Sequence, residues 1–200
     1  VTFLVAPGGE ALFGRGVARL EAGVGRGVVG GLTCSLAVSP SGLSGRELSA
    51  VLGAGEAGGA LQGALRQLRE HLHRRGPLVD YYHFALRRAV AARYELRDNT
   101  DAWHRRVASV FARGTGQREV AQLAWHQAQV ADWGGLYALL ADPDRLRLAW
   151  LDDQFRVLTY WTRIEGGSDL RMETAYAAVL AHPEAYATDV LDAVGNLLHH

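Results

Sequence analysis

The stretch Leu78-Val-Asp-Tyr-Tyr-His-Phe-Ala-Leu-Arg-Arg-Ala-Val90 changes its hydrophobic pattern halfway along. Its first six residues are rich in strand-forming side chains, whereas the residues from Phe84 to about Tyr94 have the spacing of an amphipathic helix. The stretch follows Gly76-Pro77, a dipeptide that ends helices and starts turns. These residues therefore predict a short strand that leads directly into a helix.

Three helices of the same domain are expected upstream of this strand. The spacing from Val28 to Val38 predicts the first, and the capping box of Ser44 and Glu47 begins a short second one. A longer helix is predicted from about Ala57 to Arg74, with leucines on one stripe at positions 61, 65, 68 and 72. Helix, short helix, longer helix, strand, helix is the order of a winged-helix domain, here residues 28–97. A further helix, from Leu12 to Glu21, precedes it.

Beyond Asp98 every periodic segment has helical spacing. Short amphipathic helices with short polar joints are typical of helical hairpins that stack as a solenoid, because each hairpin buries its apolar face only against a neighbour. We therefore expect a helical connector at residues 98–165 and the start of helical repeats at residues 166–200. The predicted fold class is mainly α, a winged-helix domain with a small β-wing followed by α-hairpins.

Composition excludes several kinds of chemistry. The formal net charge is zero, so a polyanionic partner such as nucleic acid would need a local basic patch. All 21 basic residues are Arg, which leaves no Lys for a phosphate-binding loop or a Schiff base. The single Cys34 lies in an apolar run and is predicted to be a buried small hydrophobe, without a disulfide or a thiolate metal site.

Two features concern the location and extent of the chain. No apolar stretch approaches the roughly 20 residues of a membrane span, and no signal sequence opens the chain, so a cytoplasmic protein is expected. The chain begins with Val1 and its first thirty residues are rich in Gly, which favours a fragment of a longer protein.

Several motifs occur together in one order: Val38-Ser-Pro-Ser-Gly-Leu-Ser-Gly-Arg-Glu-Leu48, Leu65-x-x-Leu68, Val79-Asp-Tyr-Tyr-His-Phe-Ala-Leu-Arg-Arg-Ala-Val-Ala-Ala-Arg-Tyr94, His104-Arg-Arg-Val-Ala108, Trp125-His126 with Ala131-Asp-Trp133, and Leu158-Thr-Tyr-Trp161. The first three resemble the winged-helix segment that follows the nucleotide-binding domain in NACHT-type STAND ATPases. The others resemble the connector that precedes tetratricopeptide repeats in nephrocystin-like NACHT scaffold proteins.

The resemblance implies a regulatory and relay role without a catalytic site or a metal site of its own. In that family ADP locks a closed form, and a winged-helix histidine in an aromatic-His-Phe segment contacts the β-phosphate; here that histidine is His83. Residues 1–27 would be the helical tail of the upstream nucleotide-binding domain, which would bind ADP or ATP. The partners implied are that domain and proteins bound through downstream repeats, with no membrane. The segment would not be an enzyme, because it has no phosphate-binding loop and no acidic strand end for magnesium.

Other interpretations of the same residues stay open. His83 could be a structural residue that caps or bridges the wing. A winged helix could bind DNA through arginines at positions 66, 69, 74 and 75 on its third helix and 87 and 88 on the next, although Glu70 interrupts that run. The chain could also be a purely structural protein-interaction scaffold.

The remaining histidines, tryptophans and acids are expected to be structural. His71 and His73 are predicted surface residues, and His104 and His126 packing or capping residues. The five Trp residues are expected in hairpin cores, and Asp152-Asp153 at a solvated helix cap. His199 and His200 fit either a truncated tag or a native helix end.

Overall fold

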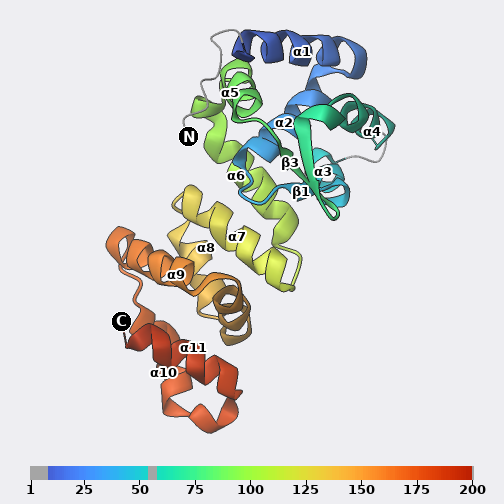
Figure 1. Ribbon diagram of the computed structural model, residues 1–200. Coiled ribbons are helices and arrows are strands. Elements are labelled where there is room, and N and C mark those ends of the chain that lie inside the picture. Colours follow the sequence, from blue (N-terminus) through green and yellow to red (C-terminus); the bar gives the residue numbers. More distant parts are fainter. Residues whose placement is uncertain (1–8, 54–57, 200) are drawn as a thin grey trace, which may run out of the picture. The chain divides into compact units, whose positions relative to one another are not determined.

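The computed structural model describes residues 9–53 and 58–199, with side chains from Phe13 onward in the first of these ranges. It is mainly helical with a small three-stranded sheet (Figure 1). The chain divides into two compact units, Val1–Val107 and Ala108–His200. None of the described helices is long and apolar enough to cross a membrane.

The first unit alternates helices with short strands. Two helices come first, and the strand predicted before Phe84 is present, whereas the two short strands at Leu43–Ser44 and Leu72–Arg75 are additional to the prediction. In chain order the elements are α1 (Gly9–Val24), α2 (Arg26–Val38), β1 (Leu43–Ser44), α3 (Gly45–Leu52), α4 (Gly58–Gln67), the 3₁₀ turn η1 (Arg69–His71), β2 (Leu72–Arg75), β3 (Leu78–Tyr81), α5 (Phe84–Arg93) and α6 (Leu96–Phe111).

The sheet has the order β1-β3-β2, and both pairings are antiparallel. β3 is the central strand. β1 pairs with the first half of β3. β2 forms a hairpin with the whole of β3, in a register that runs from Arg75 opposite Leu78 to Leu72 opposite Tyr81. Gly42 permits the close approach of β1, since its φ is +71° and a Cβ there would lie 2.3 Å from the Val79 carbonyl oxygen.

Helix α2 forms the core of the first unit. Its residues from Val29 to Leu36 are all buried, and it packs against α1, α3, α4, α5 and β3. The hydroxyls of Thr33 and Ser35 donate to carbonyl oxygens four residues earlier, at 2.7 and 2.6 Å, so these polar groups are satisfied within the helix. Cys34 is buried, as predicted, and burial raises the pKa of its thiol to about 12.

The capping box predicted at the start of α3 is confirmed. The Glu47 amide donates to the Ser44 hydroxyl at 3.2 Å, and the Glu47 carboxylate accepts from the Ser44 amide at 2.6 Å. Gly53, with φ of +68°, ends the helix in the left-handed conformation.

The long helix predicted from Ala57 to Arg74 is wrong beyond Gln67. The chain turns through η1, and Leu72 begins β2, so Arg74 lies on a strand and not on a helix. Leu72 is buried, as its position on the predicted stripe requires, but it reaches the core from the sheet. Ala57 itself lies outside the described residues.

An ion-pair cluster joins α1 to α5. The Arg93 guanidinium donates to both carboxylate oxygens of Glu21, one of them at 2.9 Å, and the Tyr94 hydroxyl donates to the same carboxylate at 2.5 Å. The hydrogen bonds from Arg93 are the largest influence on Glu21 and lower the pKa of its carboxyl to about 2. This cluster therefore fixes the position of α1 relative to α5, although more than fifty residues of sequence separate the two helices.

The second unit is entirely helical within its described residues. The helices are short except for α9, which packs against α7, α8 and α11. They are α7 (Gln117–Gln129), α8 (Trp133–Leu140), α9 (Pro143–Gly167), α10 (Met172–Ala181) and α11 (Thr188–Leu198), with a 3₁₀ turn at Pro183–Ala185.

Acidic caps divide the second unit into segments. The Asp142 carboxylate accepts hydrogen bonds from the amides of Asp144 and Arg145 at the start of α9. Asp153 has extended backbone and interrupts the same helix. Its carboxylate caps the part that follows by accepting from the Arg156 amide at 3.0 Å. The structure thus confirms a helix cap at the Asp152-Asp153 pair.

Trp161 is buried edge-on against Tyr137 and Tyr176. The other four Trp residues are half-buried, and Arg side chains lie over Trp103, Trp125 and Trp133.

Truncation of the α4 stripe tests the core of the first unit. Leu65 is 4% exposed, whereas Leu180 on α10 is 57% exposed. We expect Leu65→Ala to lower the free energy of unfolding by about 2–5 kcal/mol, because it removes buried methyl groups and leaves a cavity. Leu180→Ala is the matched control, with an expected change below about 0.5 kcal/mol. Chemical denaturation measures both, and equal small losses would contradict the burial of the α4 stripe in the core.

The Glu21 cluster predicts a pH dependence of stability. The pKa of Glu21 is about 2 in the folded protein against 4.5 as its ordinary value, so the unfolded chain binds the proton more readily. This contribution to stability is present above pH 4.5 and lost as the pH falls towards 2. Glu21→Gln should flatten the unfolding free energy across this window.

The matched control for that experiment is Glu70→Gln, because Glu70 pairs with Arg69 at the surface, where both side chains are about three-quarters exposed. Urea denaturation at several pH values gives the comparison. A Glu21→Gln protein with the same acid-induced loss as the parent would show that the cluster does not stabilise the fold.

Candidate functional site

His83 lies at the strand-to-helix junction, where the sequence predicts it. It is the N-cap residue of α5, two residues after the end of β3, and its carbonyl oxygen accepts from the Leu86 amide at 3.1 Å. Its side chain is exposed and does not cap the helix. The imidazole is therefore presented to the surface at the start of α5.

Four rings form what we call the ring cluster: Phe13, His71, Tyr82 and His83. The centroid of the His83 ring lies 4.6 Å from that of Tyr82 and 6.2 Å from that of Phe13, and Phe13 in turn lies 5.2 Å from His71, edge to face. A backbone hydrogen bond from the Tyr82 amide to the His71 carbonyl, 2.9 Å, fixes two of these residues at the open end of the hairpin. The cluster brings together α1, η1 and the segment before α5.

Large aromatic side chains flank His83 in solvent. Tyr82 is 67% exposed and Phe84 is 70% exposed. Tyr82 and Phe84 thus expose two large aromatic side chains directly before and after His83 in the sequence, and aromatic residues are enriched where one protein contacts another.

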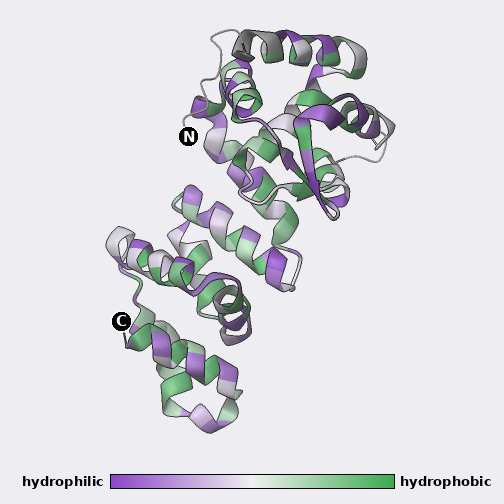
Figure 2. Cartoon of the chain, in the orientation of Figure 1, coloured by the Kyte–Doolittle hydropathy of each residue, from purple (hydrophilic) through white to green (hydrophobic). Residues whose placement is uncertain are grey.

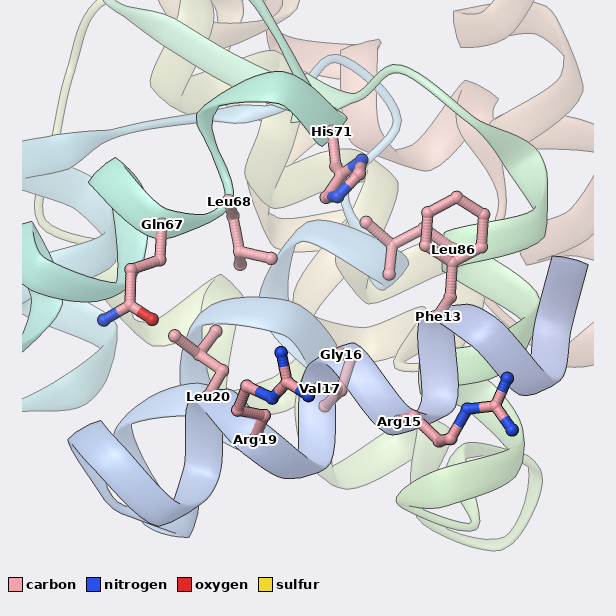
Figure 3. Close-up of a pocket in the computed structure, with 10 residues that line it drawn as sticks. All are labelled: Phe13, Arg15, Gly16, Val17, Arg19, Leu20, Gln67, Leu68, His71 and Leu86. Atoms are coloured by element: carbon pink, nitrogen blue, oxygen red, sulfur yellow. The ribbon is translucent and has the colours of Figure 1, made fainter.

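A pocket of about 430 Å³ opens beside the ring cluster (Figure 3). Its apolar wall comes from α1, the end of α4 and α5, and the Phe13 ring lies beside Leu86 with His71 above them. Four polar side chains also line it, and none of them is acidic. The lining residues are Phe13, Arg15, Gly16, Val17, Arg19, Leu20, Gln67, Leu68, His71 and Leu86.

Hydrogen bonds fix β3 and the start of α5, on either side of His83, to the core of the first unit. The buried Tyr81 hydroxyl donates to the Thr33 carbonyl oxygen at 2.6 Å, and burial raises the pKa of that hydroxyl well above its ordinary value. Arg87 donates to the Ala37 carbonyl at 2.9 Å and to the Asp80 carboxylate at 3.1 Å. The backbone on both sides of His83 is thus fixed, while the imidazole itself remains accessible.

Sequence reasoning found His83 but not the rest of the cluster. His71, predicted as a simple surface residue, is half-buried against Phe13, whereas His73 is exposed as predicted. His104 and His126 are buried in packing positions, the latter stacked on Phe111 with centroids 6.4 Å apart. Burial lowers the pKa of His104. His200 lies outside the described residues.

Five of the six arginines predicted for DNA contact separate into two sets. Arg87 is occupied by Asp80 and the Ala37 carbonyl, and Arg69 pairs with Glu70 at 3.6 Å. Arg66 is exposed on α4, while Arg74 and Arg75 are exposed on β2. Within the described ranges there is no group of three or more His, Cys, Asp or Glu residues placed to hold a metal ion.

Comparison with known proteins adds no relative: no family model matches the sequence, and no curated protein or solved structure matches it either.

Proposed function

We propose that this chain is the state-sensing and relay segment of a NACHT-type STAND ATPase. In this proposal residues 28–97 are a winged-helix domain, residues 98–165 a helical connector, and residues 166–200 the start of tetratricopeptide-type repeats that bind protein partners in the cytoplasm. The element order of the first unit and its β1-β3-β2 sheet support the winged-helix assignment. The helical second unit supports the connector.

One observation carries the functional part: His83, an exposed histidine on a fixed backbone, lies in the sequence between two residues with exposed aromatic side chains, Tyr82 and Phe84. An imidazole N–H can donate to a phosphate oxygen in either protonation state, and the amides at the start of α5 favour an anion nearby. The apolar surface of Tyr82 and Phe84 suits a closed state in which a nucleotide-binding domain upstream covers it.

The switch follows from differential affinity. A ligand shifts an equilibrium between closed and open forms only as far as it binds one of them more tightly. If His83 contacts the β-phosphate of ADP only in the closed form, ADP stabilises that form. Exchange for ATP then removes this stabilisation and releases the ring cluster from its covering domain.

Because the proposal assigns nucleotide binding to an upstream domain, it predicts that the isolated chain has no nucleotide site of its own. With no Lys in the sequence to reach the terminal phosphates, we expect no saturable binding of magnesium-ATP up to about 100 μM. Isothermal titration calorimetry measures this directly. Saturation in the low micromolar range would overturn the assignment of nucleotide binding to an upstream domain.

The sensing role is tested in the full-length protein that contains the upstream domain. We expect His83→Ala to weaken ADP binding by about 1.5–3 kcal/mol, the range for a hydrogen bond to a charged group, and to change ATP binding less. His73→Ala is the matched control, because His73 is an exposed histidine on the same hairpin.

Both nucleotide affinities and the unfolding midpoint are measured for each variant. A structural role for His83 predicts a lowered midpoint with ADP and ATP affected alike. That pattern would leave His83 as a fold residue and refute the sensing proposal.

A further inference from the structure

Although the net charge of the whole chain is zero, its two units have formal charges of opposite sign. Residues 1–107 carry 14 Arg and nine acidic residues, whereas residues 108–200 carry seven Arg and 12 acidic residues. The formal charges are therefore +5 and −5 before histidine is counted. The first unit alone has the positive sign that a polyanion would attract.

The β2–β3 hairpin concentrates part of this charge at one end. β2 is an edge strand, and the three residues that follow Leu72 on it are all exposed: His73, Arg74 and Arg75. Figure 2 colours β2 as hydrophilic along most of its length. Gly76, with φ of +59°, and Pro77 close the turn.

Helix α4 presents a second polar surface. Leu61, Ala64 and Leu65 face the core, while the outward stripe consists of Gly59, Gln62, Gly63 and Arg66, followed by Gln67. Arg and Gln are side chains that pair well with guanine and adenine edges respectively. The two glycines on this stripe let another molecule approach the helix backbone closely.

Three acidic residues in the described part of the first unit are already engaged. Glu47 closes the capping box of α3, Glu70 pairs with Arg69, and Asp80 pairs with Arg87. Among the residues that the structure describes, no ion pair involves Arg66, Arg74 or Arg75. Within those ranges the three guanidinium groups are thus exposed cations that no carboxylate neutralises.

We propose that the first unit binds double-stranded DNA, with α4 in the major groove and the tip of the β2–β3 hairpin on the adjacent phosphate backbone. A major groove about 12 Å wide admits one helix, and exposed arginines on the hairpin would supply phosphate contacts beside it. This function is separate from nucleotide sensing. His83 follows the opposite end of the hairpin, about 10–13 Å of strand away from the Arg75–Leu78 tip.

The test uses the whole chain and a fluorescein-labelled 20-base-pair duplex, followed by fluorescence anisotropy between 50 and 200 mM salt. We expect saturable binding that weakens steeply with salt. Arg74→Ala/Arg75→Ala should lower the affinity about tenfold and reduce the slope of log affinity against log salt by about two, because each substitution removes one cation from the phosphate backbone.

The matched control is Arg97→Ala/Arg113→Ala, which removes the same charge from exposed arginines outside α4 and the hairpin. We expect it to change the affinity about twofold or less. Arg66→Ala, an exposed change on α4, gives an independent variant if the hairpin variant is less stable, and it should weaken duplex binding without lowering the unfolding midpoint.

Three results would overturn the proposal: no saturable binding at 50 mM salt, an equal loss in the control variant, or tighter binding of a 20-nucleotide single strand than of the duplex. The second would indicate attraction by net charge alone, and the third a different nucleic-acid partner. None of these measurements involves His83 or ADP, so they leave the relay proposal to its own test.

Discussion

The hydrogen bond from the Tyr81 hydroxyl to the Thr33 carbonyl oxygen is the contact on which the first unit depends. It joins the last residue of the central strand to a helix whose central turns are buried. The Thr33 hydroxyl donates within α2 to the Val29 carbonyl, so the helix keeps its own polar groups satisfied. β3 ends at this fixed residue and α5 begins at Phe84, so Tyr82 and His83 form the short exposed link between them. The exposed position of His83 is a consequence of that geometry.

Local sequence signals located most of the elements correctly. The capping box of Ser44 and Glu47 satisfies amides within four residues and needs no distant partner, so it could be predicted and is confirmed. The strand and helix on either side of His83 are confirmed for a similar reason, since the pattern changes period there. In both places the information lies within one short stretch of chain.

The helix predicted through Arg74 fails for a reason that no local pattern contains. Leu61, Leu65, Leu68 and Leu72 are all buried, so the stripe is real, but the last two reach the core after the helix has ended. Pairing of Leu72 with Tyr81 across the hairpin outweighs continued helix formation, and that pairing depends on residues several positions further along the chain. The ring cluster could not be predicted either, because Phe13 meets His71 and His83 only once α1 is fixed by Glu21 and Arg93.

The β2–β3 hairpin connects its basic tip to the ring cluster, and its register limits how these two surfaces can influence each other. Leu72 and Val79 are buried, and a slip of β2 by one residue against β3 would turn Leu72 towards solvent, so the ladder between the two surfaces has one register. Tyr81 also fixes this ladder to α2. A partner that holds the hairpin tip therefore constrains the orientation of the whole sheet and of His83 with it. A local rearrangement of the strands between the two ends would expose the buried Leu72 and Val79 side chains, which opposes any independent movement of one end.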